Sequence, residues 1–357
     1  VEIRYANAVF MTFSYYAAMG LVLWVGGHKI VAGTMTLGVL TQFLAFMTIL
    51  QQPVRQVGMI VNSTARAFVS GGRVFRVLDM EPAVREKPGA PALKLDKGVL
   101  RFDHVDFAYE GDDGASPALH DICFEVGPGR VLGIVGPPGS GKSTIAHLIP
   151  RFYDATGGRI TIDGQDIRDV TLDSLRQAVG VVQQDAFLFT TSVDNNVAYG
   201  DLAAERERIV NATESTQLHN YIAGLPQGYD TLVGERGLTL SGGQRQRLSI
   251  ARSVLLTPAI ITFDDSTASV DAVTERRIRE ALTDLTRDRT TIIISHRLGS
   301  LMHADEILFL DGGRIIERGS HASLLARGGR YKELYDLQVD AGESPDMAAA
   351  PPEGTRP

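Results

Sequence analysis

The chain has 357 residues and a hydrophobic content of 44%, which suits two domains better than a protein wholly embedded in a membrane. Its formal net charge is −7 and no Lys/Arg cluster marks a basic patch, so we expect no nucleic acid among its partners. Its single cysteine, Cys123, cannot form an intrachain disulfide or a Cys-rich metal site. Cys123 lies in an apolar stretch typical of a strand, and we predict that it is a small buried residue.

Uncharged apolar stretches dominate the first 62 residues. Residues 8–25 and 37–50 contain no Asp, Glu, Lys or Arg, and the second stretch continues past Pro53. At about 1.5 Å per residue, such helices approach the roughly 30 Å hydrocarbon core of a bilayer. We therefore predict two membrane spans, at about residues 8–26 and 37–60, joined by a polar turn at 26–36. The alternative is a pair of buried helices in a soluble protein.

Basic residues flank these stretches. Arg4 precedes the first, and four arginines follow the second within residues 55–76, so the positive-inside rule places both outer ends in the cytoplasm. Apolar residues at helical spacing up to residue 80 predict a helix that continues out of the membrane. Two spans cannot enclose a substrate pathway, and we interpret residues 1–80 as the C-terminal part of a larger transmembrane domain. The proline-rich residues 81–97 are predicted to be a linker.

A glycine-rich loop between a strand and a helix indicates a phosphate site. Residues 131–149 read as an apolar strand, the pattern G-x-x-x-x-G-K-[ST], and an apolar-periodic helix. The glycines allow backbone N–H groups to turn towards phosphates at a helix N-terminus. Lys142 is expected to pair with the β- and γ-phosphates of ATP, and Ser143 to ligate Mg²⁺. The residues expected to contact ATP here are Gly136, Gly139, Ser140, Gly141, Lys142, Ser143 and Thr144.

Two acidic residues follow a second apolar strand. Residues 259–263 (AIITF) precede Asp264 and Asp265. A carboxylate at the carboxyl end of a buried strand beside a phosphate loop is placed to hold Mg²⁺ through water, and we assign this Walker B role to Asp264. The alternative is a pair of solvated loop aspartates.

Residues 238–255 contain a second anion-binding pattern. Ser241, Gly242, Gly243 and Gln244 open a helix whose free amides and serine hydroxyl can bind an anion. The run LSGGQ matches the signature sequence of ATP-binding cassette proteins, and the chain resembles that family over nearly its whole length. The resemblance implies an α/β cassette at residues 98–338, with a mixed sheet and a helical signature subdomain. It also implies preceding transmembrane helices, in the order of a type IV, subfamily B-like exporter half-transporter.

In that family two cassettes dock head to tail, and each ATP lies between the phosphate loop of one and the signature of the other. Tyr109 resembles the A-loop aromatic that stacks on adenine. Gln184 resembles the Q-loop glutamine that touches Mg²⁺ and couples to the membrane domain, and His296 resembles the switch histidine that senses the γ-phosphate. Residues 269–271 resemble the D-loop, and residues 231–237 the segment before the signature in exporters.

One position departs from the family pattern. Most members have glutamate after the Walker B aspartate to orient the attacking water and accept its proton, whereas this chain has Asp265. Aspartate is shorter by one C–C bond, about 1.5 Å, and a misplacement near 1 Å can cost about 10²-fold in rate. We expect slow hydrolysis, as at the degenerate site of heterodimeric exporters, although degenerate halves often lose the histidine retained here as His296. A heterodimer with a consensus-type partner is favoured over a homodimer.

The predicted function is that of an ATP-hydrolysing subunit that exports a hydrophobic compound, lipid or peptide across the cell membrane, with its cassette in the cytoplasm and ATP and Mg²⁺ as cofactors. The expected partners are a second half-transporter, the lipid membrane and a small hydrophobic substrate. An importer with the exporter fold and a soluble or anchored regulatory ATPase cassette are the alternatives. Residues 339–357 are predicted to form a disordered tail.

Overall fold

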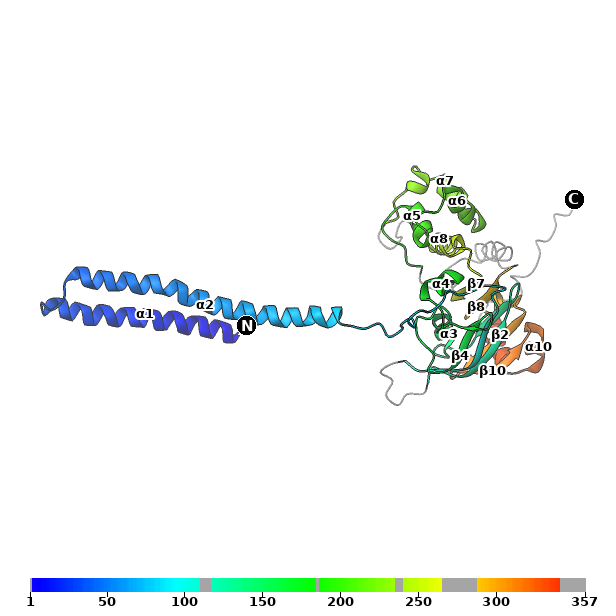
Figure 1. The fold of residues 1–357 in the computed structure, drawn as a ribbon, viewed down its shortest axis with the longest axis horizontal. Helices are drawn as coiled ribbons and strands as arrows, with labels where there is room; N and C mark the ends of the chain where they lie inside the picture. Colours follow the sequence, from blue (N-terminus) through cyan, green and yellow to red (C-terminus); the bar gives the residue numbers. More distant parts are fainter. Residues whose placement is uncertain (1, 110–116, 184–185, 235–239, 265–287, 341–357) are drawn as a thin grey trace. The chain divides into compact units, whose positions relative to one another are not determined.

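The computed structural model describes residues 2–109, 117–183, 186–234, 240–264 and 288–340 (Figure 1). The chain divides into two compact units, residues 1–82 and residues 83–357, each with its own internal contacts.

Unit 1 is a hairpin of two long helices that run side by side (Figure 1). α1 spans Glu2–Val31 and α2 spans Leu37–Leu78. The turn between them is therefore shorter than predicted, because α1 continues through most of the glycine-containing segment. Gly33 adopts a left-handed conformation in the turn (φ 71°), and the Thr36 hydroxyl caps α2.

Gly26 and Gly27, which suggested a turn, lie inside α1, and α2 approaches closely at Gly26. A Cβ on Gly26 would lie 2.5 Å from Leu40 Cδ1, so a larger residue there would displace the Leu40 side chain. Leu40 is 7% exposed, and the Tyr15 hydroxyl donates to Thr48 Oγ1 at 3.5 Å. These contacts join α1 to α2 near Tyr15 and near Gly26.

Apolar side chains cover the outside of this hairpin. Trp24 is 66% exposed and Ile60 is 62% exposed, and many other large apolar residues of both helices are similarly open. Such a surface is unfavourable in water and suits lipid or further helices. Among the helices that the structure describes, α2 alone has the length and composition of a membrane span. Its 42 residues extend for roughly 63 Å, longer than a bilayer core. The first predicted span stays a prediction.

A six-stranded sheet in the order β10-β9-β3-β8-β7-β6 forms the centre of unit 2. Neighbouring strands are parallel except at β10. Ile294 of β8 lies opposite both Ile134 of β3 and Asp264 of β7, so these three strands end at one edge. The strands are β3 Val131–Val135, β6 Val179–Val182, β7 Ile260–Asp264, β8 Thr290–Ile294, β9 Glu306–Asp311 and β10 Arg314–Gly319.

A second sheet is antiparallel, in the order β2-β1-β4-β5, and shares a hydrophobic core with the first. Phe102 and Phe124 stack in this core with ring centroids 4.4 Å apart. The prediction that Cys123 is buried is wrong: it is half-buried, because it lies on the outer face of β2 between two inward-facing residues. The strands are β1 Leu100–Phe107, β2 Leu119–Val126, β4 Gly157–Ile162 and β5 Gln165–Asp166.

Helices α5 to α8 gather into a separate part of unit 2 with a hydrophobic core of its own (Figure 1). α8 also reaches the six-stranded sheet, since Ser253 Oγ donates to the Val181 carbonyl at 3.3 Å. The mixed sheet and this helical part confirm the predicted cassette architecture. The helices are α3 Lys142–Leu148, α4 Leu172–Ala178, α5 Val193–Val197, α6 Arg206–Ser215, α7 His219–Ala223, α8 Gly242–Leu255, α10 His321–Arg327 and α11 Arg330–Asp340, with short 3₁₀ turns η1 Ala198–Gly200, η2 Gly228–Asp230 and η4 Leu298–Ser300.

Residues 83–97 of the predicted linker pack against the cassette and belong to unit 2. They form no helix or strand, as their prolines predict. Leu93 is 9% exposed, and its N–H donates to Ser174 Oγ at 2.8 Å, while the Pro91 carbonyl accepts the Thr171 N–H at 3.0 Å. The domain boundaries drawn from the sequence stay predictions.

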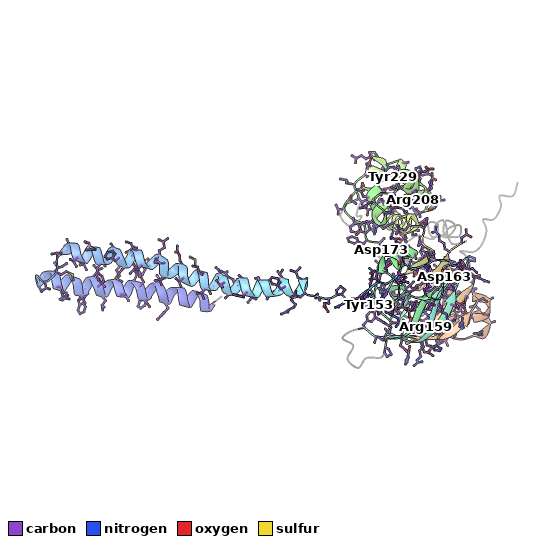
Figure 2. The ribbon with its side chains drawn as sticks, viewed as in Figure 1. Tyr153, Arg159, Asp163, Asp173, Arg208 and Tyr229 are labelled. Carbon is purple, nitrogen blue, oxygen red and sulfur yellow. The ribbon has the colours of Figure 1, made fainter. Side chains whose placement is uncertain are left out.

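Asp163, labelled in Figure 2, fixes the entry into β1. Its Oδ2 accepts the N–H groups of residues 96, 97 and 98 at 2.8, 3.1 and 3.0 Å, and its Oδ1 accepts the Val99 N–H at 2.8 Å. Burial alone would raise the pKa of Asp163, but these four bonds outweigh it and hold the pKa below its ordinary value.

Asp163→Ala is expected to destabilise the cassette by about 1–3 kcal/mol, because four backbone donors lose their acceptor. Since the folded-state pKa is depressed, this stabilisation is present above the unfolded-state pKa of about 3.9 and is lost as pH falls through the folded-state pKa. Thermal unfolding of the purified chain should show a lower Tm for the variant near neutral pH and a shrinking difference in acid. Asp169→Ala, which removes an exposed partner of Lys87, is the control and should change little. Equal Tm values for Asp163→Ala and the parent chain at neutral pH would contradict this role.

Candidate functional site

The phosphate loop leads from β3 into α3 at the carboxyl edge of the six-stranded sheet. A Cβ on Gly136 would lie 2.0 Å from the Leu310 carbonyl oxygen, and a Cβ on Gly141 would lie 2.6 Å from that of Ala118, so neither position admits a side chain. Gly139 has φ 77°, and a Cβ there would meet no atom within 4 Å. Two glycines are therefore required by close packing, and the third by its left-handed conformation on an open side of the loop.

Lys142 begins α3 and lies inside the curve of the loop. The residue is 5% exposed, and Nζ donates to the carbonyls of Gly136 at 3.0 Å and Pro137 at 2.8 Å. Anionic phosphate oxygens are stronger acceptors than neutral carbonyls. The ammonium is therefore placed to exchange these bonds for bonds to phosphate.

Ser143 and Asp264 meet although they are far apart in the sequence. Ser143 Oγ donates to Asp264 Oδ1 at 3.2 Å. Asp264 is the last residue of β7 and is 9% exposed. A hydroxyl and a carboxylate are the hard oxygen ligands that Mg²⁺ prefers, and Mg²⁺ usually keeps several waters beside one or two carboxylates and substrate phosphates. The pair fits a magnesium site next to the phosphate loop.

Tyr109 lies beside the first turn of α3. Its hydroxyl is 3.1 Å from Thr144 Oγ1, and its ring meets the rings of Phe107 and Tyr153 edge-on at 4.7 and 5.2 Å. The aromatic residue predicted to stack on adenine is therefore next to the end of the loop. Tyr153, labelled in Figure 2, is 41% exposed and was not among the predicted site residues. In the sequence, Phe152 and Tyr153 are typical of aromatic residues that pack in a core, and nothing there indicates a contact with Tyr109.

His296 lies two residues beyond β8, at the edge where β3 and β7 also end. The Ser295 N–H donates to the Ile134 carbonyl at 3.2 Å and extends the pairing of β8 with β3. The His296 carbonyl accepts Gln338 Nε2 at 2.6 Å. Its backbone is thus fixed from two sides, while the residue itself is exposed.

The signature residues form the N-terminal end of α8. Ser241 caps the helix by accepting the Gln244 N–H at 3.3 Å, and Gln244 Oε1 accepts the Ser241 N–H at 2.9 Å. This reciprocal capping box fixes the start of the helix. The hydroxyl hydrogen of Ser241 is left to donate to an acceptor such as a phosphate oxygen. Gly242 and Gly243 form the first turn without side chains that would cover it.

Arg252 joins α8 to residues 187–199 and was not predicted from the sequence. Its guanidinium donates to the carbonyls of Asn196 and Phe187 at 2.8 and 2.9 Å and lies over the rings of Phe189 and Tyr199. Burial lowers the pKa of Arg252. A signature helix and the segment that follows Gln184 are therefore tied together. Arg252 is one of three arginines in α8, and the sequence does not show which of them contacts residues 187–199.

Several predicted positions lie outside the described residues: Gln184, Asp265, residues 269–271 and residues 235–237. The structure therefore gives no geometry for the proposed water-orienting carboxylate or the Q-loop glutamine. The roles assigned to all the individual site residues stay predictions.

Known proteins similar to this chain are ABC transporters and exporters. Residues 119–268 match the family model described as ABC transporter. The chain is 39% identical over 338 residues to the ATP-dependent lipid A-core flippase of Syntrophus aciditrophicus. This match covers 95% of this chain and 56% of the flippase. It is 42% identical over 318 residues to a putative multidrug export ATP-binding/permease protein of Staphylococcus aureus, covering 89% of this chain and 55% of that protein.

A solved structure of a bacterial Atm1-family ABC exporter with ATP bound is also similar. It matches with a TM-score of 0.73 at 41% identity, over 93% of this chain and 57% of the exporter chain. The chain thus spans a little over half the length of these relatives.

Proposed function

We propose, since this chain belongs to the ABC transporter family, that it binds Mg-ATP at its phosphate loop and serves as the ATP-hydrolysing part of a membrane exporter. The observation that carries the proposal is the contact between Ser143 and Asp264 at 3.2 Å. It gathers two oxygen ligands suited to Mg²⁺ at the start of the helix that follows the loop. When bound, Mg²⁺ would neutralise charge on the β- and γ-phosphates.

Four other residues contact the phosphates, the adenine and the attacking water in this proposal. Lys142 binds phosphate oxygens by charge-assisted hydrogen bonds. Tyr109 offers its ring to adenine beside Thr144. Asp265 orients the attacking water and accepts its proton, and His296, at the same edge of the sheet as Asp264, contacts the γ-phosphate.

A second chain completes the site. The phosphate loop belongs to the core formed by the two sheets, whereas the signature helix α8 contributes to the separate core of the helical part. Each region offers its own anion-binding backbone amides. Head-to-tail pairing with another half-transporter then places a signature opposite each phosphate loop. The shortened carboxylate at Asp265 favours a heterodimer in which this chain's loop holds ATP and its Ser241–Gln244 segment serves the faster site.

Export across the cell membrane is the proposed outcome of these steps, with the cassette in the cytoplasm. The exposed apolar surface of α1 and α2, including Trp24 and Ile60, supports contact with lipid and further transmembrane helices. The similar flippase and multidrug export proteins support a hydrophobic compound, lipid or peptide as cargo.

A double-mutant cycle tests whether Ser143 and Asp264 hold one Mg²⁺. In Mg²⁺, Ser143→Ala and Asp264→Asn should each weaken ATP binding by about 1.5–3 kcal/mol, or roughly 10- to 150-fold. The double variant should be no worse than Asp264→Asn, because both side chains act through the same ion. In EDTA all variants should bind ATP alike. Binding is measured by titration of the purified chain with a fluorescent ATP analogue.

Asp311→Asn is the matched control, because Asp311 ends β9 in the same sheet. It should leave the Mg²⁺ dependence unchanged. Additive losses in the double variant, or losses that persist in EDTA, would contradict a shared magnesium site.

A further inference from the structure

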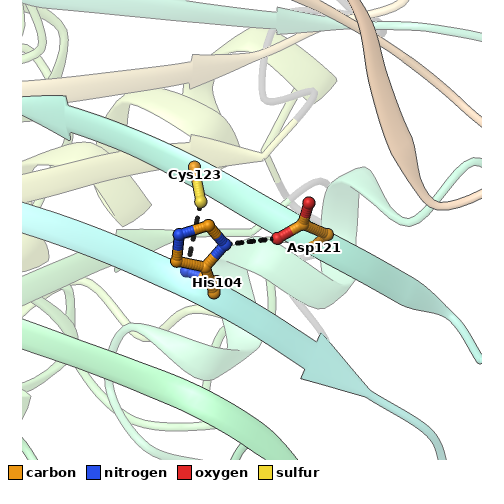
Figure 3. Close-up of side chains that lie close together, drawn as sticks. All are labelled: His104, Asp121 and Cys123. Carbon is orange, nitrogen blue, oxygen red and sulfur yellow. Dashed lines mark hydrogen bonds and ion pairs between the residues drawn. The ribbon is translucent and has the colours of Figure 1, made fainter.

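A histidine, a carboxylate and a thiol lie together on the outer face of the antiparallel sheet (Figure 3). His104 comes from β1, and Asp121 and Cys123 come from β2, with their potential ligand atoms within 4.8 Å of one another. His104 Nδ1 is 2.6 Å from Asp121 Oδ1, and the His104 backbone N–H donates to Cys123 Sγ at 3.1 Å. None of the three contributes to the proposed nucleotide site.

Two β-bulges bring these side chains together. The β1–β2 pairing shifts register on either side of Val105. The first shift places His104 beside Cys123, and the second makes room for Asp121 as an extra residue of β2. Both His104 and Asp121 have positive φ, 51° and 52°, which is uncommon for residues other than glycine. Bulges of this kind re-aim side chains relative to a regular strand.

We propose that His104, Asp121 and Cys123 form a surface site for a divalent cation of the zinc class, which cross-links β1 to β2. Zn²⁺ binds thiolate, imidazole and carboxylate ligands in tetrahedral sites at about 2.0–2.3 Å, so its ligand atoms lie roughly 3.3–3.8 Å apart. The His104 and Asp121 side chains are 74% and 60% exposed, which leaves them free to adjust from the observed separations. A thiolate also selects zinc-class ions over Mg²⁺ and Ca²⁺.

Binding releases protons and leaves one coordination position to water. The ion replaces the proton shared by His104 and Asp121, and the Cys123 thiol loses its proton to solvent. Three protein ligands leave the fourth tetrahedral position open. Because Tyr109 lies two residues beyond the end of β1, the cross-link also fixes the strand that precedes the predicted adenine contact.

Cobalt spectroscopy of the purified, reduced full chain tests the site. We expect equimolar Co²⁺ to produce thiolate-to-cobalt charge-transfer absorption that added Zn²⁺ removes. The chain has a single cysteine, so this absorption reports Cys123 alone. Cys123→Ser should abolish it, and His104→Ala and Asp121→Ala should each weaken Zn²⁺ binding by at least about 10- to 100-fold.

His120→Gln is the matched control, because His120 forms a similar pair with Asp106 at 2.8 Å on the same strands without a thiol. It should bind Zn²⁺ like the parent chain. Lys142→Ala should also keep the cobalt absorption, so a failure of nucleotide binding and a failure of the metal site are distinguishable. Absence of absorption with equimolar Co²⁺, or equal Zn²⁺ affinity in Cys123→Ser, would overturn the proposal and leave an ion pair between His104 and Asp121.

Discussion

Lys142→Ala is expected to weaken Mg-ATP binding at this chain's phosphate loop by at least about 100-fold, which corresponds to roughly 3 kcal/mol. The residue is buried at the loop, where Nζ contacts two loop carbonyls, so the ammonium is held beside the phosphate position before phosphate arrives. A preorganised charge loses little conformational entropy on binding and makes charge-assisted bonds to phosphate oxygens. Titration of the purified chain with a fluorescent ATP analogue measures the effect.

Two further variants separate charge from geometry at this position. Lys142→Arg keeps the positive charge but places a larger planar group where the lysine is 5% exposed, so it should also bind ATP weakly. Lys87→Ala removes an exposed lysine that pairs with Asp169 and should bind ATP normally. Affinity of Lys142→Ala within a few-fold of the parent chain, with an unchanged Tm, would contradict the proposed role of the loop.

Asp265→Glu is expected to raise the steady-state ATP turnover of the assembled transporter, by up to about 10²-fold at this site. The longer side chain restores the reach of roughly 1.5 Å that aspartate lacks, and general-base catalysis depends steeply on that distance. Phosphate release by the purified full-length complex measures turnover. ATP affinity should change little, because the substitution keeps the charge.

Asp264→Glu is the matched control, since it makes the same chemical change one residue earlier. It displaces the carboxylate that contacts Ser143, and turnover should fall. Unchanged turnover in Asp265→Glu would show that the shortened carboxylate does not limit hydrolysis. It would contradict the proposal that this chain's ATP site is slower than the partner's.

Local sequence patterns predicted the parts of the site that are formed by contiguous residues. The strand ending at Val135, the loop and the helix from Lys142 are contiguous, and the apolar run ending at Asp264 is the expected buried strand. Parallel strands align their carboxyl ends, so the meeting of Ser143 and Asp264 follows once both strands are assigned to one sheet.

The features that the sequence did not predict depend on contacts between distant residues. Gly26 lies inside α1, where Leu40 of the other helix packs against it. Cys123 lies close to His104 because a register shift between Phe102 and Val105 changes the pairing of their strands. Tyr153, which follows α3, meets Tyr109, which follows β1, although the two residues are far apart in the sequence. The sequence around each residue does not identify the distant residue that it contacts.

The nucleotide recovered from the chain after incubation with Mg-ATP tests the central claim most directly. The purified complex carries an alanine in place of the partner's phosphate-loop lysine, so that only this chain's loop retains nucleotide; it is separated from free nucleotide, and the bound nucleotide is extracted and identified. We expect an equimolar amount of nucleotide at this chain's loop, mostly as ATP in the wild-type chain and mostly as ADP in Asp265→Glu. Recovery of ADP from the wild-type chain as readily as from Asp265→Glu, or recovery of no nucleotide from either, would contradict it.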